Sequence, residues 1–338
     1  MLDLTQTLVD FIEIPSITGT EEDYGDALAR ELVNRGFQVE RQEVEPGRFN
    51  LLARAGAPEV VFCTHLDTVP PFFGSKVANG TIHGRGSCDA KGQAVAMLAA
   101  GERMLQAGED RIGFLFTVGE EETSDGAKVA NAKLAEPWRP RYTIVGEPTD
   151  GMFIRGHKGL FHAKLHAHGV AGHSSQKVGP SAVHELIRVT AKLLDQKWGE
   201  HPVFGPGTVN LGTLVGGVAA NVVADRAEAS VLLRAVESPD VVEARIREHL
   251  GEHVELEITG NVYGPLECHV PEGEDSKIVA FGTDAPHMPA WGTPLLFGAG
   301  SILDAHTDHE KIEVHELEDC VGRLTKTASD LLARGTAR

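Results

Sequence analysis

The fold class is decided by residues 58–70, which read PEVVFCTHLDTVP. Their first half holds the short apolar run Val60–Cys63, which is typical of a strand buried on both faces of a sheet. Two polar residues, His65 and Asp67, follow directly after this run. In open α/β sheets, ligands bind beyond the carboxyl ends of the strands, so the stretch predicts both a buried sheet and a site at its edge.

Helix and strand patterns alternate on both sides of this stretch. Residues 4–36 predict a helix, a turn and a second helix, with Thr20 as the cap of the second helix. Strands are expected at 37–40, 50–54, 112–118 and 143–145, and helices at 93–105 and 315–333. This alternation predicts an α/β fold whose mostly parallel sheet is flanked by helices.

The pattern changes after Arg155 and returns near residue 264. Strands are expected at 161–168, 208–215, 226–235 and 254–259, with helices at 181–198 and 239–250. The order strand, helix, strand, strand, helix, strand is that of a ferredoxin-like α+β unit. We therefore predict a discontinuous first domain, residues 1–156 and 264–338, and an inserted domain of residues 157–263.

The composition excludes several classes of partner. Against 31 lysines and arginines stand 49 aspartates and glutamates, giving a net charge of −18. This acidity argues against nucleic acid and anionic membranes as partners. The N-terminal residues do not form a signal peptide, and no run approaches the roughly 18 apolar residues of a membrane helix. Four cysteines without a CxxC pair favour a reducing cytoplasm.

Five acidic or histidine-containing segments lie at the ends of expected strands or in the loops that follow. They contain His65, Asp89, the triplet Glu120–Glu122, Glu147 and His306. Alone, each has an ordinary explanation, such as a loop histidine, a helix cap or a solvated acidic turn. Their occurrence together, each at a strand end, points to a metal site. Carboxylates mixed with imidazoles suit Zn²⁺, or alternatively Mn²⁺ or Co²⁺.

The motifs in these segments carry a family resemblance. The sequence contains HLDTVP (65–70), GRGSCDAKG (84–92), EEETSDGA (120–127), VGEPT (145–149), GHSS (172–175) and GSILDAH (300–306). With these motifs the chain closely resembles the co-catalytic zinc hydrolases that include acetylornithine deacetylase, succinyl-diaminopimelate desuccinylase, aminoacylase and the glutamate-releasing carboxypeptidases. The resemblance covers essentially the whole chain.

The resemblance implies a pair of zinc ions and assigns their ligands. One ion would be held by His65 and Glu147, and the other by Glu121 and His306. The carboxylate of Asp89 would bridge both ions.

Two further roles follow from the same resemblance. Asp67 would orient His65 by accepting a hydrogen bond from its second ring nitrogen, and Glu120 would be the general base. The register of the glutamate triplet rests on the following residues 124–127, which match the family pattern EExGSxGA. The alternative register, one residue later, would make Glu121 the base and Glu122 the metal ligand.

The resemblance also assigns residues that contact the substrate. His173 would stabilise the oxyanion, often in the active site of the partner subunit. Asn221 and Arg234 resemble residues that contact the substrate and its α-carboxylate. Gly300 and Ser301 offer backbone N–H groups to a carboxylate.

These residues predict hydrolysis of the amide bond of a small N-acyl amino acid by a metal-activated water. The first expectation is an N-acetylornithine-type deacetylase of amino-acid (arginine) biosynthesis, because GRGSCDAKG looks nearest to that branch. Acetylcitrulline, succinyl-diaminopimelate and acyl-lysine substrates stay open. A dipeptidase or carboxypeptidase with the same site is the alternative, and an inactive binding homologue is a third.

The sheet expected in the inserted domain is the basis for a prediction of the oligomeric state. An exposed edge of its sheet is able to pair with a second copy across a two-fold axis. We expect a homodimer formed through this lid or dimerisation domain. A monomer in which the domain is only a lid is the alternative.

Overall fold

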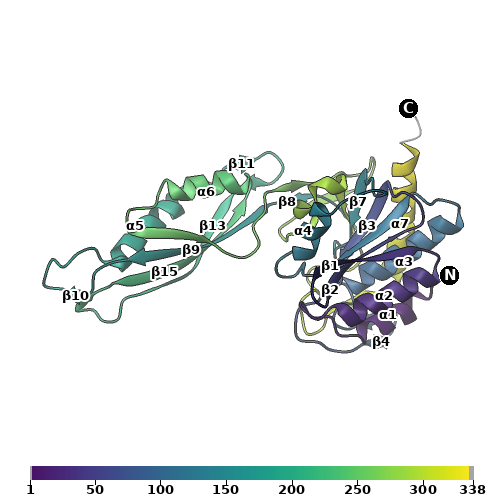
Figure 1. Ribbon diagram of the computed structural model, residues 1–338, viewed down its shortest axis with the longest axis horizontal. Coiled ribbons are helices and arrows are strands. Elements are labelled where there is room, and N and C mark those ends of the chain that lie inside the picture. The colour runs from purple at the N-terminus through teal and green to yellow at the C-terminus, as the bar shows by residue number, and fades with distance from the viewer. Residues whose placement is uncertain (1, 335–338) are drawn as a thin grey trace. The chain divides into compact units, whose positions relative to one another are not determined.

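The computed structural model describes residues 2–334 and divides into two compact units (Figure 1). The first unit runs to Arg155 and resumes over Glu267–Ile278 and from Thr283 onward. The second consists of Gly156–Leu266 with Val279–Gly282. The boundaries predicted from the sequence lie between residues 156 and 157 and between residues 263 and 264. No sequence pattern indicates that residues 279–282 belong with the second unit.

A nine-stranded sheet forms the centre of the first unit. Its order is β1-β2-β6-β3-β7-β19-β8-β17, with β18 beside β8. The strands are β1 (Gln38–Glu45), β2 (Arg48–Arg54), β3 (Val60–His65), β6 (Ile112–Thr117), β7 (Tyr142–Val145), β8 (Phe153–His157), β17 (Leu266–Glu267), β18 (Ser276–Val279) and β19 (Thr293–Leu296). The four neighbours β6, β3, β7 and β19 are parallel, which confirms the predicted mostly parallel sheet.

The apolar runs explain this arrangement. Every residue of β3 and β6 is buried, as a strand covered on both faces requires. The edge strand β1 is instead polar and mostly exposed, and it pairs antiparallel with β2. The expected strand at 37–40 is therefore longer in the structure, because its polar half lies at the sheet edge.

Within the described residues, five α-helices belong to the first unit. They are α1 (Leu4–Ile12), α2 (Glu22–Asn34), α3 (Lys91–Gln106), α4 (Asp125–Ala132) and α7 (Val314–Ala333). α1, α3 and α7 pack against one another (Figure 1). The second helix does not begin with a Thr20 cap as expected. The Thr20 hydroxyl donates instead to Ile17 O at 2.7 Å within the preceding turn.

The first unit also contains several short elements. They are β4 (Lys76–Ala78), β5 (Thr81–His83) and β20 (Lys311–Glu313), which form a small sheet, and the 3-10 turns η1 (Ala285–His287) and η2 (Pro289–Trp291). Among residues 2–334, no helix is both long and apolar enough to cross a membrane.

The second unit has the predicted ferredoxin-like order. Its main elements are β9 (Gly159–His168), α5 (Ala182–Asp195), β13 (Thr208–Gly216), β15 (Arg226–Ala235), α6 (Pro239–Arg247) and β16 (Val254–Ile258). The antiparallel sheet has the order β13-β15-β9-β16. Residues of β9 and β15 alternate between buried and partly exposed, because α5 and α6 cover one face (Figure 1). Short pairs are formed by β10 (Gly172–His173) with β14 (Val222–Val223), and by β11 (Glu200–His201) with β12 (Gly205–Pro206).

Candidate metal centre

The first unit brings the predicted ligands together at the carboxyl edge of its parallel strands. His65 is the last residue of β3, and Glu121 follows β6. Glu147 follows β7, and His306 lies in the loop after β19. Asp89 comes just before α3. Because parallel strands end at the same edge, residues far apart in the sequence meet there.

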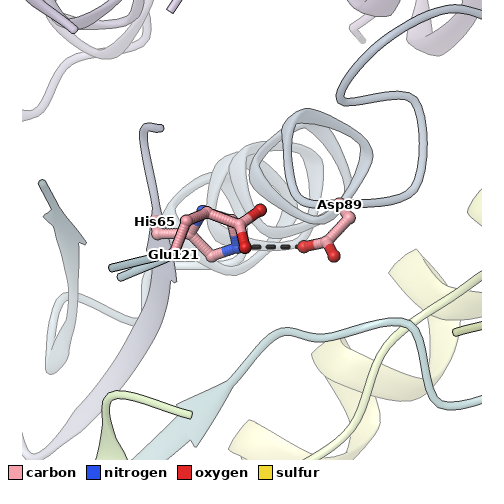
Figure 2. A group of neighbouring side chains, drawn as sticks. All are labelled: His65, Asp89 and Glu121. Atoms are coloured by element: carbon pink, nitrogen blue, oxygen red, sulfur yellow. Dashed lines mark hydrogen bonds and ion pairs between the residues drawn. The ribbon is translucent and has the colours of Figure 1, made fainter. Parts of the chain in front are cut away.

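Short distances join these side chains. His65 Nε2 lies 3.0 Å from Asp89 Oδ1, and a dashed line in Figure 2 marks this contact. His306 Nε2 lies 3.3 Å from Asp89 Oδ2 and 3.0 Å from the Glu121 carboxylate. Glu147 Oε2 lies 4.0 Å from His65 Nε2. Ligand atoms of His65, Asp89 and Glu121 all lie within 4.8 Å of one another, so one cation is able to contact all three.

Asp67 organises the neighbouring backbone. Its buried carboxylate accepts hydrogen bonds from the N–H groups of Glu120 and Glu121, each at 3.1 Å, and from the Thr18 hydroxyl at 2.9 Å. The Nδ1 atom of His65 lies 2.9 Å from the main-chain oxygen of Asp67 and 3.5 Å from Oδ1. Asp67 therefore contacts both the predicted ligand and the segment that carries the predicted base.

Burial dominates the electrostatics of the glutamates. It raises the pKa of Glu120 and of Glu147 well above the ordinary value, and the charge of each neighbouring carboxylate adds to the effect. Burial also raises the pKa of Glu121, although the hydrogen bond with His306 opposes the increase.

The pKa values of His65 and His306 are both raised, which favours the positively charged form of each ring. Hydrogen bonds with Asp89 and Glu121 raise the pKa of His306 to about 10. Burial disfavours a charged His65, but hydrogen bonds with Asp67 and Asp89 hold its pKa well above the ordinary value. Asp89 is buried too, and its two histidine partners keep its pKa below the ordinary value.

The donor set fits divalent cations. The carboxylates of Asp89, Glu121 and Glu147 lie within 4.0 Å of His65 or His306, and the carboxylate of Glu120 interacts electrostatically with those of Glu121 and Glu147. Such a density of buried negative charge is costly unless cations compensate it. Imidazole nitrogens with carboxylate oxygens are ligands that suit Zn²⁺, Co²⁺ or Mn²⁺.

The structure distinguishes the members of the glutamate triplet. Glu121 contacts His306, whereas Glu122 is exposed. Glu120 is half-buried and bonded through its N–H to Asp67. Of the two residues in question, Glu121 therefore contacts a second predicted ligand, and Glu120 is bonded to Asp67.

Three of the predicted substrate residues lie in the second unit. His173 is exposed on β10, which pairs with β14. Asn221 comes just before β14, and its carbonyl accepts the N–H of Ser174 at 3.0 Å. His173 and Asn221 are therefore neighbours on one strand pair. Arg234 lies half-buried on β15.

Gly300 and Ser301 lie in the first unit, against the loop that carries Asp89. Gly300 has φ +76°, and a Cβ at this position would lie 2.7 Å from the Cβ of Cys88. The Cys88 thiol lies 3.9 Å from the Ser301 carbonyl oxygen. Both a left-handed backbone and this close contact require glycine at position 300.

Two buried acids near the centre had no signal in the sequence. Glu310 is fully buried and bonded to Arg85 and to the loop before α3. Asp284 accepts the Thr117 hydroxyl at 2.6 Å, and burial raises its pKa to about 6. Neither residue belongs to one of the sequence motifs above, so only the fold reveals it.

Comparison with known families gives a match over most of the chain. A family model described as peptidase family M20/M25/M40 matches residues 61–330.

Relatives and solved structures agree with this match. A peptidase M20 domain-containing protein of Schizosaccharomyces pombe is 36% identical over 90% of this chain and 79% of the relative. A probable carboxypeptidase of Aspergillus terreus is 35% identical over 92% of this chain and 82% of the relative. Among solved structures, a dinuclear metal binding M20 peptidase of Bacillus subtilis superposes with a TM-score of 0.73. The superposition covers 98% of both chains at 14% identity, which shows a shared fold.

Proposed function

The chain belongs to peptidase family M20/M25/M40, and from this premise we propose that it hydrolyses an amide bond next to a free carboxylate with two metal ions. One observation carries the proposal. His65, His306 and the surrounding carboxylates converge on Asp89 at the edge of the parallel sheet.

The proposed ligands divide around Asp89. His65 and Glu147 would hold one ion, Glu121 and His306 the other, and Asp89 would contact both. Zn²⁺ is the proposed metal, with Co²⁺ or Mn²⁺ as substitutes. When bound, the pair of ions would acidify a water and polarise the scissile carbonyl.

Glu120 is the proposed general base. The bond from its N–H to Asp67 fixes the backbone from which its carboxylate projects. Burial raises the pKa of Glu120 in the protein without metal. As the base, its carboxylate would take a proton from water and pass it to the leaving amine.

His173 is the proposed donor to the developing oxyanion. Its Nδ1 accepts the backbone N–H of Ser175 at 3.2 Å. A backbone N–H can only donate, so Nδ1 carries no proton and the neutral ring carries its hydrogen on Nε2. The Nε2–H group is then the free end that would donate to an oxyanion.

Carboxypeptidase activity is the first candidate specificity. Relatives with 32–35% identity are named probable carboxypeptidases. Such a reaction needs an anchor for the terminal carboxylate of the substrate. The guanidinium of Arg234, the Asn221 amide and the N–H groups of Gly300 and Ser301 are the proposed anchors.

Deacylation of an N-acyl amino acid is the second candidate. The same anchors and base would serve it, because the leaving group again carries a free carboxylate. The GRGSCDAKG motif at 84–92 favours this branch, with N-acetylornithine as the leading substrate.

A substrate panel separates the two candidates. The purified chain with added Zn²⁺ or Co²⁺ is assayed for amine release from dipeptides, N-acetyl amino acids and N-succinyl amino acids, with a chelator control. We expect metal-dependent turnover of peptides with a free C-terminus. Turnover confined to one N-acyl amino acid would establish the deacylase instead. Peptides blocked at the C-terminus should be poor substrates, and equal turnover of blocked peptides would contradict the carboxylate anchor.

We also propose that the second unit forms a homodimer. Its strand β13 ends the sheet, and Leu214, Val215 and the nearby Val218 are 44%, 60% and 83% exposed. An apolar edge strand favours pairing with a second copy. Light scattering should give twice the chain mass of 36.2 kDa. The change Val215→Lys should shift the mass to that of one chain, and a monomeric wild-type protein would contradict the proposal.

A reducing cytoplasm is the proposed location. Cys63, Cys88, Cys268 and Cys320 are all buried and free of disulfide bonds. Free buried thiols are typical of proteins in reducing compartments.

A further inference from the structure

We infer that Glu310 is a positioning residue that holds Asp89 in place for metal binding. The inference rests on the proposed metal centre and adds a residue that lies outside its ligand set.

Glu310 is completely buried, and its carboxylate binds the loop before α3. Its Oε1 atom accepts three backbone N–H groups: Gly86 at 3.0 Å, Cys88 at 3.1 Å and Asp89 at 3.1 Å. Three donors converging on one oxygen fix the course of the loop. The third of these donors is the N–H of the proposed bridging residue itself.

The loop is shaped for this contact. Gly86 has φ +89°, a left-handed conformation that glycine adopts without strain. A Cβ at Gly86 would lie 2.9 Å from the buried side chain of Lys91, so the position also has no room for a larger residue. With this turn, the N–H groups of Gly86, Cys88 and Asp89 converge on one oxygen, much as the N–H groups of a backbone nest converge on an anion. Here the anion is a side chain of the protein.

The second oxygen of Glu310 is also bound. Its Oε2 atom accepts a hydrogen bond from Arg85 Nη1 at 2.6 Å, and both side chains are buried. The main-chain oxygen of Glu310 accepts the N–H of Gly84 at 3.1 Å. Glu310 therefore contacts the loop at both ends of residues 84–89.

Glu310 also connects two of the proposed ligand loops. It lies in the same segment as His306, whose Nε2 is 3.3 Å from Asp89 Oδ2. His65 Nε2 contacts the other oxygen of the same carboxylate at 3.0 Å. A shift of the Asp89 backbone would change both distances. The buried Glu310 carboxylate therefore sets the spacing between Asp89 and each of the two histidines. Partners of this kind typically change metal affinity by about 10- to 100-fold when removed.

The test compares Glu310→Gln with Glu313→Gln. Glu313 lies in the same segment, but it caps α7 and accepts the Thr81 hydroxyl at 2.9 Å. Each full-length variant is stripped with chelator and titrated with Co²⁺ alone. Affinity and the visible absorption of the bound ion are recorded, and thermal unfolding of the stripped proteins is measured in parallel.

We expect Co²⁺ affinity to fall about 10- to 100-fold in Glu310→Gln, with an altered absorption spectrum, and to stay within about twofold of wild type in Glu313→Gln. If Glu310→Gln does not fold, Glu310→Asp replaces it, because it keeps the charge but withdraws the carboxylate from the three N–H groups. Unchanged affinity and spectrum in the folded Glu310 variant would overturn the inference and leave the centre standing. A wild-type protein that binds no Co²⁺ would overturn the proposed function and the inference together.

Discussion

Glu120 and Glu122 are separated by one residue but lie in different surroundings. Glu120 is half-buried beside Asp67, whereas Glu122 is exposed. If Glu120 is the base, Glu120→Gln should lower turnover by about 10²- to 10⁴-fold, because the amide cannot take up the proton. Bound metal, measured by elemental analysis, should not change. Glu122→Gln is the matched control and should retain activity. Full activity in Glu120→Gln, or loss only in Glu122→Gln, would contradict the assigned register.

His173 supports a second prediction at this scale. The Ser175 N–H occupies Nδ1 and leaves Nε2–H as the donor. The change His173→Ala should lower kcat by about 10²- to 10³-fold, with a small change in KM, because the lost bond forms mainly in the transition state. His168→Ala, which removes an exposed histidine of β9 in the same unit, is the control. Equal losses of kcat in both variants would argue against an oxyanion role.

The candidate ligands were predictable because they occur in motifs at strand ends. His65 and Asp67 follow an apolar run, and the glutamate triplet follows another. Glu310 was not predictable, because it lies in the polar stretch 306–311 that resembles an ordinary surface loop. Its partner Arg85 is 225 residues away in the sequence. Only the fold brings such a pair together.

The longer elements were predicted because their apolar residues form either a continuous run or a regular alternation. β3 and β6 are continuous apolar runs, and β9 and β15 alternate. The three strands β4, β5 and β20 have three residues each, which is too short for a pattern. Their small sheet is instead held by the pairing of β4 with its neighbour β5 and by the pairing of β5 with β20, which is distant in the sequence.

Lys91 joins two elements and gives a stability prediction. This buried side chain starts α3 and donates from Nζ to the carbonyls of Phe11, at 3.0 Å, and Ile14, at 2.5 Å, where α1 ends. The change Lys91→Met should lower the free energy of unfolding by about 1–3 kcal/mol, because buried carbonyls lose their donor. Chemical denaturation measures this loss. Lys192→Met on the exposed face of α5 should be nearly neutral, and equal stability of the two variants would contradict the proposed link.

At the scale of the whole molecule, the cluster of titratable side chains in the candidate metal centre makes stability depend on pH. Without metal, Glu120, Glu147, His65 and His306 have raised pKa values. Each binds its proton more tightly in the folded than in the unfolded chain. The stability they provide is present at low pH and is lost as the pH rises through the folded pKa values, which reach about 10 for His306.

Metal ions replace these protons, so the gain in Tm on adding Zn²⁺ should grow between about pH 6 and about pH 9. Burial lowers the pKa of Lys91 from its ordinary 10.5 to about 7. Between these two pH values, the contribution of Lys91 to stability rises with pH, which is opposite to the trend of the four groups above. Lys91 lies outside the ligand set, so its effect cancels in the difference between loaded and stripped protein. Calorimetry across this pH range measures the difference. A gain that is constant or falls with pH would contradict proton release from the centre.

The most direct test of the central claim is stepwise return of metal to the stripped protein. Zn²⁺ is added to the chelator-treated chain while bound metal is counted and amide hydrolysis is followed with the best substrate of the panel. The proposed centre predicts no turnover in the stripped protein and full turnover when two ions are bound per chain. Hydrolysis that persists without metal, or full metal loading without hydrolysis of any amide in the panel, would contradict it.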